Sequence, residues 1–399
     1  MNRTQRLLRK PLTAVVLSIF IGLAVGAVVL SVAGYHPGEA YRALVMGIFS
    51  KPRYMAQVVI RSTPLILTGL SVAFAFKTGL FNIGAEGQYI IGSVAAALVG
   101  TQLSLPPVLH FIACAAAGML AAALWGAFCG LLKARYGIHE VITCIMLNWI
   151  ALYFNNFMVN LPWLKKPKTE ASYEIADTAW SMVLGHWKTS EEGLAYFANH
   201  PQLKDVLIRT DLNYGILITL AVVAVVWFIL NRTVIGYELR SVGFNKDAAE
   251  FAGVNIKKRM ILSMALAGAL AGLAGVLQLT GTGLHRINIL AAHEGFGFDG
   301  ISVALVAGSS PVGCVLSGLL FGALKYGSAS IQSVVNAPSE VINIVIGVIV
   351  FCVAMSTVFP MIADRLELRA DKKKAKSAPP DPSPEELPPE AAGEGGNKA

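Results

Sequence analysis

Apolar residues in this chain occur in long uninterrupted runs, not in the alternating or amphipathic stripes typical of water-soluble proteins. No charged side chain occurs in residues 87–132, 141–164, 212–231, 261–284 or 341–363. A helix that crosses a bilayer needs about 20 mostly apolar residues, because an unpaired backbone amide in hydrocarbon costs several kcal/mol. The pattern therefore predicts an all-α polytopic membrane protein.

The runs divide into ten apolar elements, at least one of them short. Leu103–Pro107 separates the third element from the fourth, because proline cannot continue a helix. The expected spans are 12–33, 56–76, 83–100, 107–132, 139–160, 213–231, 259–281, 298–308, 312–330 and 340–358. We interpret the first span as a retained helix; the alternative is a cleaved signal sequence.

Composition and charge placement agree with this class. Only 14% of the residues are charged, whereas soluble domains carry about 25%. The net charge of +8 is concentrated at the ends of apolar runs, as expected of cytoplasmic anchors and not of a nucleic-acid surface. With the basic N-terminus inside, ten crossings return the C-terminus to the cytoplasm. In this orientation Arg42, Lys51 and Arg53 fall on the outer side of the membrane. We therefore expect an interfacial helix over 38–50.

The domain organisation follows from these spans. We expect residues 1–11 to form a cytoplasmic N-terminus, 12–358 the transmembrane domain and 359–399 a disordered cytoplasmic tail rich in Pro, Glu, Gly and Ala. Two long polar loops interrupt the transmembrane domain. Residues 162–211 are expected to face outward, and residues 232–259 are expected to face the cytoplasm.

Enzymatic motifs are missing from the sequence. It has no HExxH or GxSxG motif and no Gly-Lys dipeptide, so a phosphate-cradling GxxxxGK[ST] loop is absent. We therefore expect no catalytic residues here and, if ATP drives the protein, ATP and Mg²⁺ on a separate polypeptide. The five cysteines lie inside apolar runs without a CxxC pair, and no metal site is predicted.

Two glycine-bracketed breaks interrupt apolar stretches in corresponding parts of the two halves. They read Gly-Leu-Phe-Asn-Ile-Gly at 79–84 and Gly-Phe-Gly-Phe-Asp-Gly at 295–300, which favours a possible inverted repeat with broken helices. Polar residues inside a membrane are costly and therefore informative. The candidate substrate-pathway residues are Asn82, Glu86, Gln88, Asn148 and Asp299. The open alternatives are that Asn82, Glu86 and Asp299 satisfy backbone amides freed by the breaks, and that Asn148 forms a hydrogen bond between helices.

Residues 232–259, called the inward loop below, carry the second candidate site. Asn245 is suited to cap a short helix that begins near Lys246, and Gly253 is suited to end it. A helix of this length is unstable alone in water, so it becomes useful when it docks into a partner. An ordinary amphipathic loop helix is the alternative. The candidate residues for coupling to a partner are Asn245, Ala248, Ala249, Glu250 and Gly253.

With these motifs in view, the chain resembles a known family over residues 55–357. The inward loop is similar to the coupling loop of bacterial ATP-binding-cassette (ABC) importer permeases. The segments 79–88, 265–275 and 295–305 resemble those of permeases that serve branched-chain amino acids, simple sugars and nucleosides. The nucleoside branch, which works with basic-membrane-lipoprotein binding proteins, is the most similar. The turn Gly308–Gly313 departs from the more usual Asn-Pro-Leu-Gly, so the resemblance is more specific for family than for substrate.

The resemblance implies a type II importer fold and a division of labour. A lipoprotein delivers substrate outside, two permeases form the path, and ATPase subunits dock on the inward loops. The long outward loop resembles that of the larger permease, which implies a heterodimer with a shorter permease, or less favourably a homodimer. Three alternatives stay open: a sugar permease, a branched-chain amino acid permease, and an ion-coupled transporter in which Glu86 and Asp299 titrate.

Overall fold

The computed structural model describes residues 11–358, 361, 364 and 365. The predicted N-terminal segment 1–11 and the predicted tail 359–399 therefore lie almost entirely outside the described residues. The chain divides into two compact units. The larger unit is Ile19–Ala354, and the smaller comprises the described residues within 11–18 and from Met355 onward.

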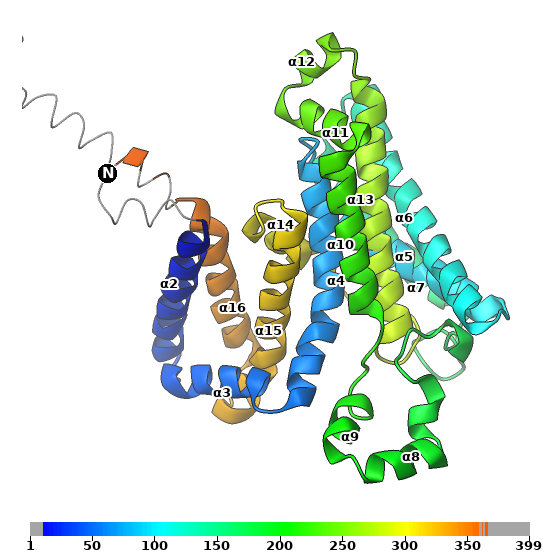
Figure 1. The fold of residues 1–399 in the computed structure, drawn as a ribbon, viewed down its shortest axis with the longest axis vertical. Helices are drawn as coiled ribbons and strands as arrows, with labels where there is room; N and C mark the ends of the chain where they lie inside the picture. Colours follow the sequence, from blue (N-terminus) through cyan, green and yellow to red (C-terminus); the bar gives the residue numbers. More distant parts are fainter. Residues whose placement is uncertain (1–10, 359–360, 362–363, 366–399) are drawn as a thin grey trace, which may run out of the picture. The chain divides into compact units, whose positions relative to one another are not determined.

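The described part of the chain is helical and has no β-strand beyond three isolated bridges. The long helices of the larger unit match the predicted spans closely, as Figure 1 illustrates. In chain order the α-helices are α2 (Pro11–Val32), α3 (Pro37–Phe49), α4 (Pro52–Phe76), α5 (Ala85–Gln102), α6 (Pro107–Tyr136), α7 (Glu140–Val159), α8 (Glu191–Ala198), α9 (Pro201–Leu207), α10 (Gly215–Arg232), α11 (Val234–Phe244), α12 (Lys246–Phe251), α13 (Ile256–Gly281), α14 (Phe296–Val306), α15 (Pro311–Val335) and α16 (Ser339–Ala354). Short 3-10 turns lie at Asp177–Ala179, Gly185–Thr189 and Met355–Thr357.

Six of these helices, α4, α6, α7, α10, α13 and α15, have the length and composition to cross a membrane. Val16–Val32, Phe296–Val306 and Glu340–Ala354 are shorter apolar helices. The prediction of an all-α polytopic membrane protein is confirmed. The third predicted element, 83–100, forms as α5, which carries Glu86 and Gln88 and buries most of its residues inside the protein.

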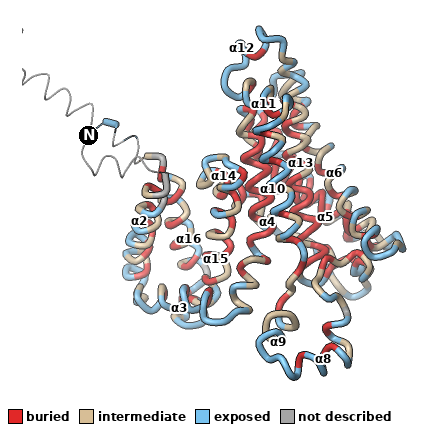
Figure 2. The backbone as a smooth tube through the Cα atoms, in the orientation of Figure 1, coloured by how far each residue is buried: buried red, intermediate tan, exposed pale blue. Residues whose placement is uncertain are grey.

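Helix α13 lies at the centre of the larger unit, against α4, α5 and α6. Figure 2 shows buried residues concentrated along this centre. Small residues allow the close approach: a Cβ added at Gly126 would overlap the Met264 carbonyl, and one at Gly268 would overlap the Ala122 carbonyl. Gly126 and Gly268 therefore permit the close packing of α6 against α13.

The two long polar loops lie at opposite ends of this bundle (Figure 1). The 162–211 loop carries α8 and α9 at one end, and the 232–259 loop carries α11 and α12 at the other. This arrangement is expected of segments on two sides of a membrane. The predicted interfacial segment near residues 38–50 forms α3, which packs against α15.

Candidate functional site

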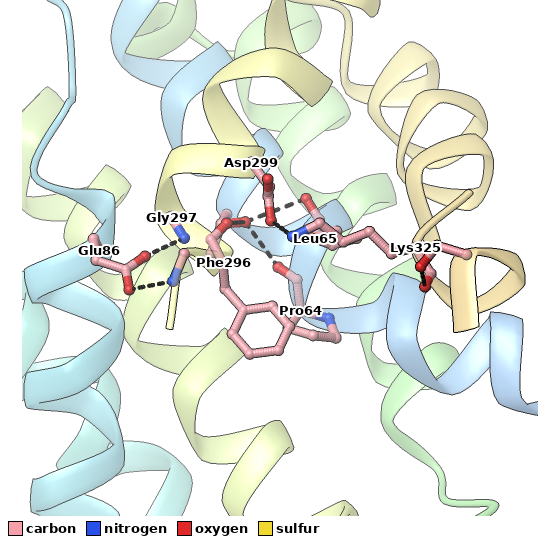
Figure 3. A network of polar contacts seen from close by, with 10 residues as sticks. Pro64, Leu65, Glu86, Phe296, Gly297, Asp299 and Lys325 are labelled. Carbon is pink, nitrogen blue, oxygen red and sulfur yellow. Dashed lines mark hydrogen bonds and ion pairs between the residues drawn. The ribbon is translucent and has the colours of Figure 1, made fainter. Parts of the chain in front are cut away.

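The second glycine break, residues 295–300, contains the start of α14, which is capped by Glu86 of α5. Gly295 adopts a left-handed conformation with φ +88°, and α14 receives no cap from its own side chains. Instead the Gly295 amide donates to Glu86 Oε1 at 2.8 Å and the Gly297 amide donates to Glu86 Oε2 at 2.6 Å (Figure 3). Glu86 is fully buried, so its carboxylate caps the helix from another element and complements the helix dipole.

The first glycine break is stabilised by a buried amide pair. Asn82 donates to Gln88 Oε1 at 2.8 Å, and Gln88 donates to Asn82 Oδ1 at 3.1 Å. Asn148 of α7 accepts from the Gly87 amide at 2.8 Å and donates to the Ile83 carbonyl at 3.1 Å. These side chains are at most 2% exposed. Their described contacts satisfy the backbone and one another, which is the alternative role that the sequence left open.

The two breaks meet in space although they are more than 200 residues apart. A Cβ added at Gly297 would overlap the backbone of Glu86, so α14 and α5 approach as closely as glycine permits. On the other side of α14, the Thr68 hydroxyl of α4 donates to the Phe296 carbonyl at 2.9 Å. Asp299 forms an ion pair with Lys325 of α15 (Figure 3). The start of α14 is thus fixed from three neighbouring helices.

Two adjoining cavities open beside this junction. The larger, about 430 Å³, lies among α4, α13, α14 and α15, and the smaller, about 150 Å³, lies beside α5 and α13. Both are lined by Gln278, Thr282, Gly283 and Glu294. The five pathway residues named from the sequence are absent from the lining of either cavity.

The sequence reasoning missed several charged residues of the larger cavity. Arg61 lies within α4 and Lys325 within α15, inside the predicted spans 56–76 and 312–330. The guanidinium of Arg61 lies over the Tyr326 ring, 5.6 Å from its centroid. An ionisable residue inside a span is by default a functional candidate, so the signal was present in the sequence. Glu294, in the connection between α13 and α14, lines both cavities.

The outward loop covers the connection between α13 and α14. The Ser172 amide donates to the Ile287 carbonyl at 2.9 Å, and the Ile175 amide donates to the His285 carbonyl at 2.8 Å. His285 is buried and stacks on Trp180 at 4.1 Å between ring centroids. Burial lowers the pKa of its imidazole, so the ring is neutral near pH 7. The loop therefore forms a lid beside the cavities.

The inward loop folds as its sequence predicts. Helix α12 spans Lys246–Phe251, and Asn245 Oδ1 accepts from the Ala248 amide at 3.0 Å. Gly253 has φ +84°, the left-handed conformation that ends the helix. Phe244, the last residue of α11, and Phe251, the last residue of α12, are 95% and 96% exposed. An open groove of about 680 Å³ lies between α11 and α12, lined partly by Ala248 and Ala249.

The inward loop also contacts the first glycine break. A Cβ added at Gly243, near the end of α11, would overlap the Lys77 carbonyl at the end of α4. Gly79, with φ +72°, lies against the same glycine. Contacts therefore run continuously from α11 through residues 77–84 to Glu86 and on to the start of α14.

The chain is similar to known permeases over most of its length. Residues 54–354 match the family described as branched-chain amino acid transport system, permease component. The chain is 38% identical to the guanosine ABC transporter permease protein NupP of Bacillus subtilis, over 88% of this chain and 95% of NupP. It is 32% identical to the nucleoside ABC transporter permease protein NupB of Lactococcus lactis, over 95% and 100% of the two chains. It is 30% identical to the glucose ABC transporter permease protein TsgB13 of Haloferax volcanii, over 86% and 87%. No solved structure matches the chain.

Proposed function

Because the chain belongs to the permease family of branched-chain amino acid transport systems, we propose that it is the membrane-spanning permease subunit of an ATP-driven nucleoside importer. The observation that carries the substrate class is the identity to NupP and NupB, named for guanosine and nucleosides, along nearly their full lengths. The meeting of two broken elements inside the helical unit supports a transport path. Such breaks supply polar backbone where a path crosses the bilayer.

The energy source of the proposed transport is a separate ATPase subunit that binds ATP and Mg²⁺. Its docking site is the inward loop, with Asn245, Ala248, Ala249, Glu250 and Gly253 forming or flanking α12. Two features support this role: the loop extends from the end of the bundle, and the aromatic side chains of Phe244 and Phe251 are almost fully exposed. Exposed aromatic residues are typical anchors of protein interfaces.

The proposed coupling mechanism follows the contacts from α11 to α14. Closure of the ATPase subunits moves α11 and α12, and Gly243 transmits the movement to residues 77–84. Glu86 then shifts the start of α14 beside the cavities. This is a population shift between outward- and inward-open states, biased by ATP binding at the far end. The pathway role of Asn82, Gln88, Asn148 and Asp299 in this scheme is to maintain the two breaks as they move.

The complete importer contains further proposed partners. A second, shorter permease completes the path, and an extracytoplasmic lipoprotein delivers substrate to the 162–211 lid. In the proposed importer, the inward loop and both termini lie on the cytoplasmic side of a bacterial cell membrane.

Reconstitution of the complete importer tests the proposal. Proteoliposomes containing this permease, its shorter partner, the ATPase and the lipoprotein should accumulate radiolabelled guanosine when ATP is present, and a proton uncoupler should leave the rate unchanged. Accumulation by this chain alone, or its abolition by the uncoupler, would support an ion-coupled transporter instead. Radiolabelled glucose and leucine serve as competing substrates, since one relative is named for glucose. Uptake of glucose but not guanosine would overturn the substrate assignment.

A further inference from the structure

The larger cavity combines an aromatic face with a ring of polar groups. Phe296 is half-buried and lines the cavity, and its ring lies 5.2 Å from that of Tyr89, centroid to centroid. Gln278, Thr282 and Glu294 line the same space with donors and acceptors. The volume of about 430 Å³ lies within the range of small-molecule sites, about 300–1,000 Å³. This chemistry suits a ligand with a flat ring and several hydroxyl groups.

Phe296 is held more rigidly than an ordinary loop aromatic residue. It is the first residue of α14, between the two amides bound by Glu86. Its own carbonyl accepts the Thr68 hydroxyl at 2.9 Å. Tyr89, which is 2% exposed, supports the Phe296 ring from α5. A ring fixed before the ligand arrives loses little entropy on binding, which favours it as a stacking platform.

The charged groups around the cavity supply no excess of positive charge. Arg61 and Lys325 contribute two cations, and Asp211 and Glu294 contribute two anions. Asp299, the ion-pair partner of Lys325, adds a third anion beside them. Phosphate recognition requires excess positive charge with free donors, so these charges favour an uncharged ligand over a nucleotide.

From these observations we infer that the larger cavity is the nucleoside-binding site of the permease, with the base stacked on Phe296 and with Gln278, Thr282 and Glu294 bonding its polar groups. The inference rests on the proposed nucleoside transport and adds residues to it. The cavity also adjoins the element that the inward loop moves. A shift of α14 that carried Phe296 away would release the base as the path opens inward.

The closing experiment compares the same substitution at two positions of one helix. Phe296→Leu removes the aromatic face and keeps apolar bulk. Phe298→Leu is the control, because Phe298 is 39% exposed and lies outside the lining of both cavities. In the reconstituted importer with saturating guanosine-loaded lipoprotein, Phe296→Leu should lower guanosine uptake at least tenfold. ATP hydrolysis stimulated by the lipoprotein should stay within twofold of wild type, and Phe296→Trp should restore uptake.

The outcomes separate the cavity from the proposed function. If wild-type importer transports guanosine but both leucine variants behave alike, the site assignment is wrong and the proposed function stands. Loss of uptake and ATP hydrolysis together in Phe296→Leu would mark a purely structural residue and likewise overturn the assignment. If wild-type importer transports no nucleoside, the proposed function fails, and the site assignment that rests on it fails with it.

Photolabelling provides a direct readout without transport. 8-Azidoguanosine should label cavity segments of the purified wild-type importer in the absence of lipoprotein. Guanosine should compete at least tenfold better than guanosine 5′-monophosphate, because the cavity has no excess of positive charge to bind a phosphate group. Equal competition by the two compounds, or labelling confined to residues outside 57–65 and 278–296, would overturn the inference.

Discussion

Replacing Glu86 by glutamine changes one atom and tests whether the carboxylate is a helix cap or a proton carrier. Both carboxylate oxygens accept backbone amides at the start of α14, at 2.8 and 2.6 Å. A glutamine amide retains one acceptor oxygen and points an NH₂ donor at the second backbone N–H. One buried N–H is then left without an acceptor and faces another donor.

The expected cost follows from that count. A buried donor left unsatisfied costs about 1–3 kcal/mol, so Glu86→Gln should lower the free energy of unfolding by about that amount. Glu86→Ala leaves both amides unsatisfied and should lower it by about 2–6 kcal/mol. Glu39→Gln, at an exposed position in the first turn of α3, is the matched control and should stay within about 0.5 kcal/mol of wild type.

Denaturant titration of the purified permease in mixed detergent micelles gives these free energies, and guanosine uptake measured on the same variants gives function. If Glu86 acts as a helix cap, both the free energy of unfolding and guanosine uptake should decrease in the order wild type, Glu86→Gln, Glu86→Ala. A Glu86→Gln variant with wild-type stability, no uptake and an altered pH profile would refute the reasoning. That result would identify Glu86 as a proton-carrying side chain and revive the ion-coupled hypothesis.

Three further predictions concern the ends of the bundle. Phe251→Ser should leave stability unchanged, because the side chain is 96% exposed. The same change should weaken binding of the ATPase subunit by about 30-fold in pull-down titrations. As the control, Leu203→Ser on α9, at the opposite end of the bundle, should leave that affinity unchanged. Gly243→Val should destabilise the protein by about 1–3 kcal/mol through overlap with the Lys77 carbonyl. It should also lower the ratio of guanosine transported to ATP hydrolysed. An unchanged ratio would remove this contact from the mechanism. The folded-state pKa of His285 lies below its ordinary value of 6.5, so the unfolded chain binds a proton more readily than the folded chain. The unfolding midpoint should therefore fall as the pH drops below 6.5. His285→Gln should make the midpoint less dependent on pH in this range.

Much of the architecture was predictable because its signals are local. Ten apolar runs, separated by prolines, glycines and basic clusters, predicted ten of the helices to within a few residues. The cap of α12 was predictable for the same reason, since Asn245 binds an amide three residues away and Gly253 ends the helix two residues beyond it. Such interactions depend on backbone geometry within one turn, which neighbouring residues determine.

The roles of the membrane polar residues were not predictable in this way. The sequence identified Glu86 and the second break as unusual, but nothing within one turn of Glu86 indicates an acceptor for amides 209 and 211 residues away. Asn82 and Gln88 looked like pathway residues because they are polar, whereas the fold pairs them with each other. Arg61 and Lys325, in separate helices, line a common cavity only because α4 and α15 pack together. The sequence determines which segments enter the membrane, because transfer of apolar surface is additive along the chain. Tertiary packing decides which polar groups find partners and which face a cavity, because those outcomes depend on residues distant in sequence.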